Sequence, residues 1–222
     1  MQTLAAELHT LCQNGAADII VCGRQVSMPG HSLLLPENCC PLKGEHNLYN
    51  IMVAYGVSKL YGVSDEAFLT AIASFEPLPH RLRNIGSYDG VIYYDDSIST
   101  ACETAIQAME SLKDPGVGSL LLGGMDRGID YTSLCDYLMD HAPDHLILMP
   151  DSGMRIGDML VERGYTAPVH RVSGLQEAVE KAKNVTPKGK VCLLSPASAS
   201  YGFFKNFEDR GDRFAEFVRG KR

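Results

Sequence analysis

From residue 100 onward, short apolar runs alternate with longer stretches in which apolar residues recur every three or four positions. The apolar runs predict strands at 119–122, 145–149, 169–172 and 191–194. The periodic stretches predict helices at 100–112, 131–139, 153–163, 175–184 and 204–218. This alternation predicts an α/β, Rossmann-like fold with a mainly parallel sheet and helices on both faces.

Two of these helix starts have the spacing of a capping box. In that motif a hydroxyl and a carboxyl or amide three residues later satisfy free backbone groups at the helix start. Thr100 with Glu103 and Ser173 with Gln176 have this spacing. We therefore expect Thr100 and Ser173 to cap their helices.

The chain before residue 77 has a different pattern. A helical stretch at 4–12 precedes apolar runs at 19–22 and 32–36, which a Pro-Gly turn separates into predicted strands. A helix is expected from residue 44, and its apolar spacing predicts a buried face of Leu48, Ile51, Met52 and Tyr55. A second helix is expected from Ser64, its N-cap, to about Phe75.

The best domain boundary is the proline-rich segment after that second helix. Pro77 and Pro79 stiffen the chain and end the helix. We expect one domain at 1–76 and another at 77–222. The second should open with a hairpin of strands 83–87 and 91–94.

Composition and charge narrow the classes of function. With 45% hydrophobic and 21% charged residues the protein is able to bury a core. A net charge of -7 argues against binding nucleic acid or an anionic membrane surface. No apolar run is long enough to span a membrane and no secretory signal is present, so we expect a cytoplasmic, monomeric protein with small-molecule substrates. The seven cysteines are scattered without metal-ligand spacing, and no metal site is proposed.

Polar residues follow three of the predicted strands, where open parallel sheets bind ligands. In the first loop, the Asp96 carboxylate can bind a ribose or a metal ion. Alternatively, it belongs to an ordinary turn in which side chains form hydrogen bonds with their own backbone. Thr100 can hold a carboxylate together with the amides of a helix start. Arg127 offers a planar donor pair for a carboxylate or phosphate, or is simply solvated. Ser200 lies at the entry to the last helix, and no nucleophile elbow surrounds it.

Other candidates lie near the boundary. Asn47 and Asn50 are three residues apart, so both amides face the same side of the predicted helix and can meet a ligand. His80 and Arg81 place positive charge in the linker, where phosphate charge could be offset, although such a pair is more often a surface feature. No G-x-x-x-x-G-K-S/T phosphate loop occurs in the 222 residues.

Five segments carry a resemblance to a known family. They are 44–50 (GEHNLYN), 78–81 (LPHR), 94–100 (YDDSIST), 123–128 (GGMDRG) and 195–211 (SPASASYGFFKNFEDRG). In this order they resemble the UDP-N-acetylmuramoyl-L-alanine:D-glutamate ligases of the Mur ligase family, cytoplasmic enzymes of peptidoglycan precursor synthesis that serve cell-wall formation and division. The resemblance implies that 1–76 is the C-terminal part of a central ATPase domain and that 77–222 is the C-terminal, amino-acid-binding domain.

The resemblance also implies a reaction and residue roles. In the family, ATP phosphorylates the muramoyl-alanine carboxylate, the D-glutamate amine attacks the acyl phosphate, and Mg²⁺ offsets charge. By similarity, the catalytic residues are His80 and Arg81. The ATP-binding residues are Asn47, Asn50, Arg81 and Asp96. The D-glutamate-binding residues are Thr100, Arg127, Ser200, Tyr201 and the Phe207 backbone.

The chain departs from the family pattern at two positions, where many relatives have lysine in place of Ile98 and of Arg127. Arg127 keeps the positive charge, whereas Ile98 does not. The phosphate loop and the Mg²⁺ ligands of the family would lie upstream of Met1, so we expect the 222 residues alone to be inactive. Alternatives are a D-alanyl-D-alanine-adding or folylpolyglutamate-type ligase and a non-catalytic α/β binding module.

Overall fold

The computed structural model describes residues 20–22, 24–28, 30–37, 39, 40, 42 and 45–220. The chain divides into two compact units, Met1–Pro77 (unit 1) and Leu78–Arg222 (unit 2). The division falls one residue beyond the boundary expected from the prolines. The predicted helix at 4–12 lies outside the described residues. Among the described residues, no helix combines the length and apolar character needed to cross a membrane.

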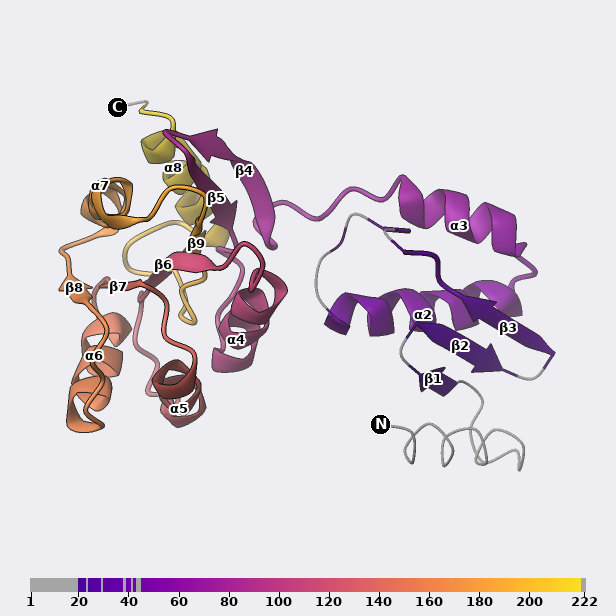
Figure 1. Cartoon of the computed structure of the whole chain (residues 1–222), viewed down its shortest axis with the longest axis horizontal. Coiled ribbons are helices and arrows are strands. Elements are labelled where there is room, and N and C mark those ends of the chain that lie inside the picture. Colours follow the sequence, from indigo (N-terminus) through magenta and orange to yellow (C-terminus); the bar gives the residue numbers. More distant parts are fainter. Residues whose placement is uncertain are drawn as a thin grey trace. The chain divides into compact units, whose positions relative to one another are not determined.

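Unit 1 contains a small antiparallel sheet and two helices (Figure 1). The strands are β1 (Ile20–Cys22), β2 (Gln25–Met28) and β3 (His31–Leu34), and the helices are α2 (Glu45–Leu60) and α3 (Asp65–Ala73). Ile51, Met52 and Tyr55 are buried, as the apolar spacing predicts. Ser64 caps α3, because its hydroxyl accepts a hydrogen bond from the Ala67 amide. Strand β2 was not predicted, since its sequence has too few apolar residues to form a run.

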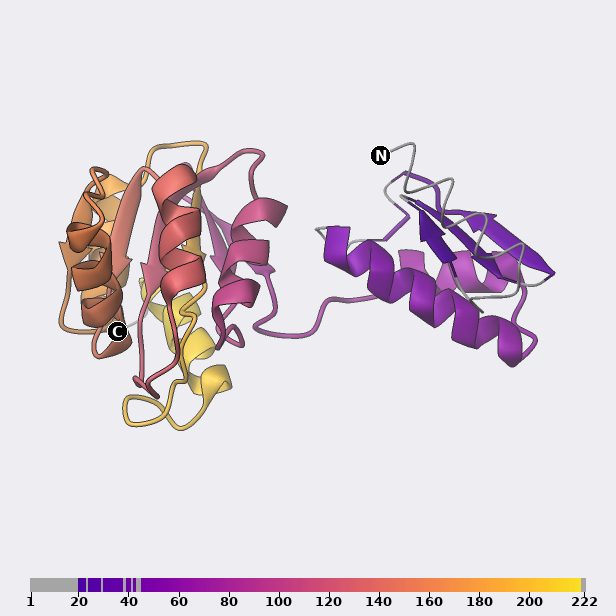
Figure 2. The ribbon, with the colours of Figure 1, turned by 90° about the horizontal axis from the view of Figure 1, so that it is seen from below.

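Unit 2 is a six-stranded sheet with helices on both faces (Figures 1 and 2). The strands are β4 (Arg83–Tyr88), β5 (Val91–Asp95), β6 (Val117–Leu122), β7 (His145–Leu148), β8 (Val169–Arg171) and β9 (Val191–Leu194). The helices are α4 (Cys102–Ser111), α5 (Thr132–Asp140), α6 (Ser152–Glu162), α7 (Leu175–Val185) and α8 (Phe207–Val218). Only the β4–β5 hairpin is antiparallel, so the predicted fold class and hairpin are confirmed.

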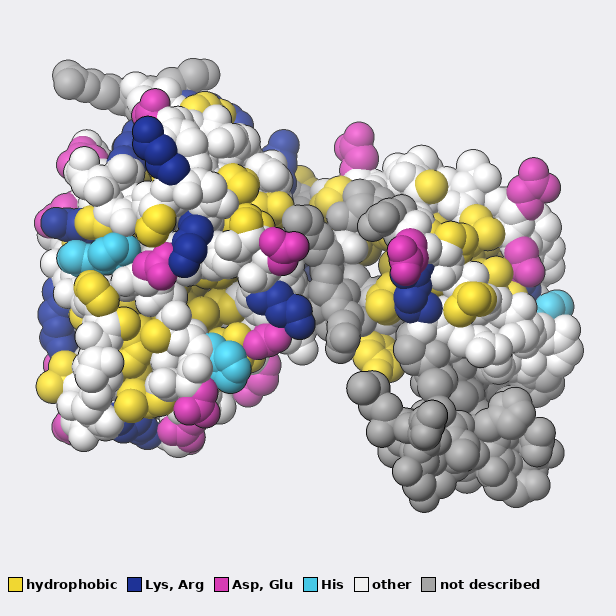
Figure 3. Space-filling model, in the orientation of Figure 1, with side chains coloured by type: hydrophobic (Ala, Val, Ile, Leu, Met, Phe, Trp, Pro, Cys, Tyr) yellow, Lys and Arg dark blue, Asp and Glu magenta, His cyan; other side chains and the backbone are white. Residues whose placement is uncertain are grey.

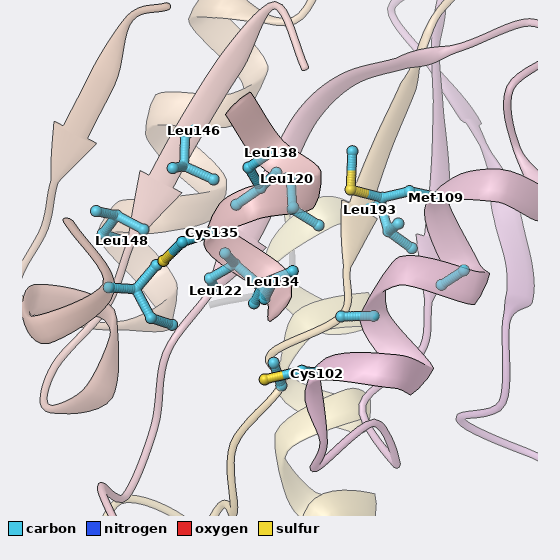
Figure 4. Close-up of a cluster of buried hydrophobic side chains, with 14 of the residues drawn as sticks. Cys102, Met109, Leu120, Leu122, Leu134, Cys135, Leu138, Leu146, Leu148 and Leu193 are labelled. Atoms are coloured by element: carbon cyan, nitrogen blue, oxygen red, sulfur yellow. The ribbon is translucent and has the colours of Figure 1, made fainter. Parts of the chain in front are cut away.

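Alternate residues of the central strands point to opposite faces and build two cores. Leu120 and Leu122 of β6 face α4, α5 and α6, and Figure 4 shows these leucines meeting Leu134 and Leu138 of α5. Leu121, between them, belongs to the second core, which α7 and α8 cover. Figure 1 shows the sheet between these two groups of helices. Burial on both faces explains why the strands read as continuous apolar runs.

The strand order places the loops that carry the candidate residues at one edge. Along the sheet the order is β4-β5-β9-β6-β7-β8, so β9 lies between β5 and β6. The chain moves outward from β5 through β6 and β7 to β8, and returns to the middle of the sheet as β9. The carboxyl ends of β5, β9 and β6 are therefore neighbours at a switch in strand order, which is where ligands bind in such sheets.

The predicted helix caps require correction. Helix α4 begins after Ala101, whose side chain has no oxygen, so Thr100 is not the N-cap. At α7 the N-cap is Gly174, and both the amide and the hydroxyl of Ser173 donate to Glu177, not to Gln176. The predicted partner was wrong by one residue: Ser173 pairs with Glu177, whose carboxylate is a stronger acceptor than the amide of Gln176.

The start of α8 also differs from the prediction. It lies at Phe207, three residues later than the predicted start. The side chain of Asn206 accepts a hydrogen bond from the Asp209 amide at 2.8 Å and so caps the helix there.

Candidate functional site

The loops after β5, β6 and β9 are joined by backbone hydrogen bonds at the carboxyl edge of the sheet of unit 2. The Asp96 amide donates to Leu194 O at 2.8 Å, and the Gly123 amide donates to Pro196 O at 3.0 Å. The Met125 amide donates to Ala199 O at 2.8 Å. The end of β9 and the loop after it are thus the common partner of the other two loops, and the three form one surface.

Gly124 is required where the β6 loop passes the β9 loop. Its φ is +150°, and an added Cβ would lie 2.5 Å from Ala199 O. Its carbonyl accepts hydrogen bonds from the amides of Asp151 and Ser152, at the start of α6. A residue with a Cβ could not occupy this position without a clash, so glycine allows the two loops to approach closely.

Arg127 is displayed by a loop that other residues hold in place. Arg155 of α6 donates two hydrogen bonds of 2.7 Å to the Asp126 carboxylate and a third to Ile129 O, and its guanidinium stacks over the Tyr131 ring. Arg155 lowers the pKa of Asp126 below its usual range. Arg127 is exposed, and no residue of the described chain forms an ion pair or hydrogen bond with it. The loop therefore presents a free guanidinium on a fixed backbone.

Two buried carboxylates lie at the end of β5: Asp95 is its last residue and Asp96 follows it. Asp96 accepts hydrogen bonds from the Ser195 hydroxyl at 2.7 Å and from the Leu82 amide at 3.0 Å. Burial raises the pKa of Asp96 to about 7, although these hydrogen bonds oppose the shift. Burial likewise raises the pKa of Asp95, against the opposing effect of its contact with His80.

His80 is part of this buried group. Its Nδ1 lies 2.7 Å from Asp95 Oδ2, and its carbonyl accepts from the Ile98 amide. The space beside the ring is filled by helix α8, because a Cβ on Gly211 would lie 2.1 Å from His80 Nδ1. The side chain of Arg81, the next residue, is exposed. His80 thus anchors the first residues of unit 2 to the sheet and leaves Arg81 at the surface.

The glutamate candidates of the sequence analysis all lie at this edge. Thr100 is half-buried just before α4, and Ser200 is buried in the β9 loop while Tyr201 beside it is exposed. Phe207 opens α8, and its carbonyl accepts a hydrogen bond from the Ser97 hydroxyl. The topology therefore brings Thr100, Arg127, Ser200, Tyr201 and Phe207 to neighbouring loops.

The remaining candidates belong to unit 1. Asn47 and Asn50 lie on α2, where Asn50 Nδ2 donates to Asn47 Oδ1 at 3.2 Å. Their shared helix face is as predicted.

Arg210 is a site residue that the sequence analysis missed. It lies in the first turn of α8 and is fully buried, and it donates hydrogen bonds to Ser97 and Ser198. Burial lowers its pKa to about 10. A signal was present, because Arg210 precedes the buried Phe214 and Val218 by four and eight residues and so falls on the apolar face of α8.

Curated proteins similar to this chain are named as ligases that add glutamate to UDP-N-acetylmuramoyl-alanine. This chain is 40% identical to UDP-N-acetylmuramoyl-L-alanine--L-glutamate ligase from Salinispora tropica, over 86% of this chain and 43% of that protein. UDP-N-acetylmuramoylalanine--D-glutamate ligases from Geobacter sp. (38% identity, 80% of this chain, 38% of that protein) and Lactobacillus delbrueckii (34%, 96% and 46%) also match. The chain belongs to the Mur ligase family. It spans less than half of the length of these relatives.

Parts of two solved ligase and synthase structures share the fold of this chain. UDP-N-acetylmuramate-alanine ligase MurC from Thermotoga maritima matches with a TM-score of 0.61 and 17% identity, over 90% of this chain and 44% of that one. Folylpolyglutamate synthase from Mycobacterium tuberculosis matches with a TM-score of 0.62 and 16% identity, over 87% and 44%. No protein-family model matches the chain.

Among the described residues, no group of three or more His, Cys, Asp or Glu side chains comes together in a way that could hold a metal ion.

Proposed function

We propose that this Mur ligase chain is the amino-acid-binding part of an ATP-dependent ligase that adds D-glutamate to UDP-N-acetylmuramoyl-L-alanine during peptidoglycan precursor synthesis. The observation that carries the proposal is the free guanidinium of Arg127 on a braced loop, beside the loops of Thr100 and Ser200. Glutamate has two carboxylates, and this edge offers two places for an anion.

The first place combines Arg127 with Thr100. A guanidinium pairs with a carboxylate through two parallel hydrogen bonds, and the Thr100 hydroxyl adds a donor from the neighbouring loop. The second place combines Ser200 and Tyr201 with the backbone at Phe207, where α8 begins. Amides at a helix start favour an anion. No residue of the described chain forms a hydrogen bond with the side chains of Thr100 and Ser200, which leaves both hydroxyls available.

The residues proposed for ATP fit a nucleotide. The oxygens of Asp96 each accept one hydrogen bond and retain a second lone pair for a ribose hydroxyl. Arg81 adds exposed positive charge, and we assign to His80 the task of holding the backbone beside it. Asn47 and Asn50 offer amide groups on α2. When bound, ATP with Mg²⁺ supplies the phosphoryl group that activates the muramoyl-alanine carboxylate.

Unit 1 fits the proposed role as the C-terminal part of the ATPase domain. One side of α2, continued by the residue just after it, exposes apolar side chains at a four-residue spacing. We call this set the α2 stripe: Tyr49, Val53, Val57 and Tyr61. Contiguous exposed apolar surface marks an interaction site. We propose that the stripe packs on the remainder of the ATPase domain, which belongs to the part of the relatives' length that this chain does not span.

The same proposal places the protein in the cytoplasm, as a monomer, with no nucleic-acid or membrane partner. On the face drawn in Figure 3, basic side chains are interspersed with acidic ones and form no continuous basic area. The net charge of -7 agrees with small anionic substrates held by a few placed cations rather than by a basic surface.

A second candidate substrate is L-glutamate. Relatives from Salinispora tropica and Micromonospora sp., at 40% and 37% identity, are named as L-glutamate ligases. In the family resemblance described above, Ile98 is also a departure from the lysine expected at this position. The two enantiomers present their carboxylates to the same two anion sites but direct the amine differently, so a binding comparison distinguishes them.

A titration tests the proposed function. Amide chemical shifts of the 222-residue chain are followed while D-glutamate or L-glutamate is added, for the wild type and for Arg127→Met. The expected result is saturable shifts in the β5, β6 and β9 loops with one enantiomer, which Arg127→Met weakens about tenfold. Arg171→Met, in an exposed ion pair on β8, is the matched control and should bind normally. Equal binding by Arg127→Met and the wild type, or binding of neither enantiomer, would contradict the proposal.

A further inference from the structure

The buried side chain of Arg210 connects the β5 loop and the β9 loop, which carry residues proposed to bind glutamate. Its Nε donates to Ser97 Oγ at 2.9 Å, and its Nη2 donates to Ser97 O at 2.7 Å and to Ser198 O at 3.0 Å. Ser97 lies in the β5 loop and Ser198 in the β9 loop. One planar guanidinium from α8 thus binds the backbone of both loops.

These contacts are close in sequence to the groups proposed to bind glutamate. Ser97 precedes Thr100 by three residues, and Ser198 precedes Ser200 by two. The Ser97 hydroxyl, which accepts from Arg210, also donates to the Phe207 carbonyl at 2.8 Å. A displacement of Arg210 therefore changes the separation of the two anion sites.

The network continues to the loop that carries Arg127. Ser198 Oγ lies 2.6 Å from Ser152 Oγ and 2.9 Å from the Tyr131 hydroxyl. Ser152 Oγ in turn donates to Gly124 O at 3.1 Å. All of these side chains are buried, so the three loops share one hydrogen-bonded support.

Stability alone does not call for a cation at this position. A buried guanidinium carries a desolvation cost, and within the described chain Arg210 has no carboxylate within ion-pair distance to offset it. One of its nitrogens, Nη1, is buried without any hydrogen-bond partner. Phe214 and Val218 fill the same face of α8 with apolar groups. What a hydrocarbon side chain would not supply is a rigid fork that reaches three acceptors in two loops.

We propose that Arg210 is a positioning residue for the amino-acid substrate, which sets the distance between the Thr100 and Arg127 anion site and the Ser200 site. It does not touch the ligand, because its guanidinium is fully buried. The inference rests on the proposed function. It adds a residue that controls glutamate affinity through two loops.

Substitution with chemical rescue tests this role. Glutamate titrations are compared for the wild-type chain, Arg210→Met, Arg210→Lys and Arg210→Ala, the last with and without guanidinium ion at a concentration below that which unfolds the protein. We expect Arg210→Met and Arg210→Ala to bind at least about tenfold more weakly, since small misplacements of binding groups are costly. Guanidinium should restore binding to Arg210→Ala. Arg210→Lys should bind glutamate as weakly as Arg210→Met, because one ammonium group cannot donate to all three acceptors that the guanidinium reaches.

A control separates positioning from general loss of stability. Val218→Ala lies on the same face of α8, away from the loops, and should lower the melting temperature without weakening glutamate binding. Normal binding by a folded Arg210→Met, or an equal loss in Val218→Ala, would overturn the positioning role. If Arg210→Ala does not fold, the comparison of Arg210→Met and Arg210→Lys with the wild type decides: weaker binding by both folded variants supports the positioning role, and wild-type binding by either overturns it. If the wild type itself binds neither enantiomer, the proposed function fails; if it binds and Arg210→Met binds equally, only the positioning role fails.

Discussion

The two units differ in what they bury and what they expose. Unit 2 covers both faces of its sheet with helices and buries a connected set of polar side chains at one edge. The described part of unit 1 has a single apolar core and exposes the α2 stripe. Buried polar networks are costly unless every member finds partners, so their concentration at one edge of unit 2 supports the proposed site there. The exposed stripe is instead the surface that we propose packs on the remainder of the ATPase domain.

This difference also bears on the alternative of a non-catalytic module. In such a module the glycine and aspartate loops would be ordinary turns. Gly124 is instead in contact with the β9 loop, and the Asp96 carboxylate is buried between Leu82 and Ser195. These contacts join three segments of unit 2, which supports the proposed binding role of this edge over a set of independent turns.

The largest expected loss of stability comes from a substitution in the core of unit 2. Phe214→Ala removes a fully buried ring between α8 and the sheet, which should cost about 3–5 kcal/mol of stability. Because the units have separate cores, α2 should keep its wild-type unfolding midpoint. Urea titrations followed by amide resonances of each unit measure both transitions. A parallel shift of the two would show that the units unfold together.

The next largest loss of stability is expected at Gly124, where the cost of a steric clash can be compared with the cost of a positive φ alone. Gly124→Ala places a methyl group against Ala199 O at a positive φ, which should cost about 2–3 kcal/mol and disturb the β9 loop. Gly164→Ala is the control for a positive φ without a close contact, with φ +76° and no atom within 4 Å of the added group. It should cost about 1 kcal/mol through backbone strain alone. Equal costs in thermal unfolding would remove the role assigned to close approach.

Much of unit 2 follows from the sequence, since apolar runs and helical spacing each report local burial. The strand order does not follow, because nothing in the similar runs of β6 and β9 shows that β9 inserts beside β5. The candidate residues Thr100, Arg127 and Ser200 were predicted from their positions after strands. Their support was not: Arg210 is 113 residues from Ser97 and Arg155 is 29 from Asp126. The helical spacing places Arg210 on the buried face of α8, but it gives no signal of the distant loops that Arg210 contacts.

A smaller effect concerns the buried carboxylate of Asp96. Its pKa of about 7 in the folded chain lies above the usual value, so the folded state retains a proton that the unfolded chain releases. The stabilising contribution is full at pH values below the unfolded pKa, near 4, and is lost as the pH rises through about 7. Asp96→Asn cannot ionise. Its melting temperature should therefore fall less steeply than that of the wild type between about pH 4 and pH 8.

The control for this measurement is Asp140→Asn, an exposed position at the end of α5. It should follow the wild-type pH curve. The amide that Asp96→Asn introduces makes a poorer partner for Leu82 and Ser195, so a constant loss at all pH values is expected. Only the slope tests the claim, and equal slopes for Asp96→Asn and the wild type would count against a raised pKa.

The smallest effect on stability is expected at the α2 stripe, where the contrast between the units is sharpest. Val53→Thr and Val57→Thr change exposed side chains, so each should alter the unfolding free energy by no more than about 0.5 kcal/mol. Ile51→Thr, on the buried face of the same helix, should be clearly destabilising. If the stripe is a packing surface, the double Val53→Thr, Val57→Thr variant should bind less of a dye that fluoresces on exposed apolar surface. Unchanged dye binding with unchanged stability would mean that the stripe is ordinary solvated surface and that unit 1 needs no further partner.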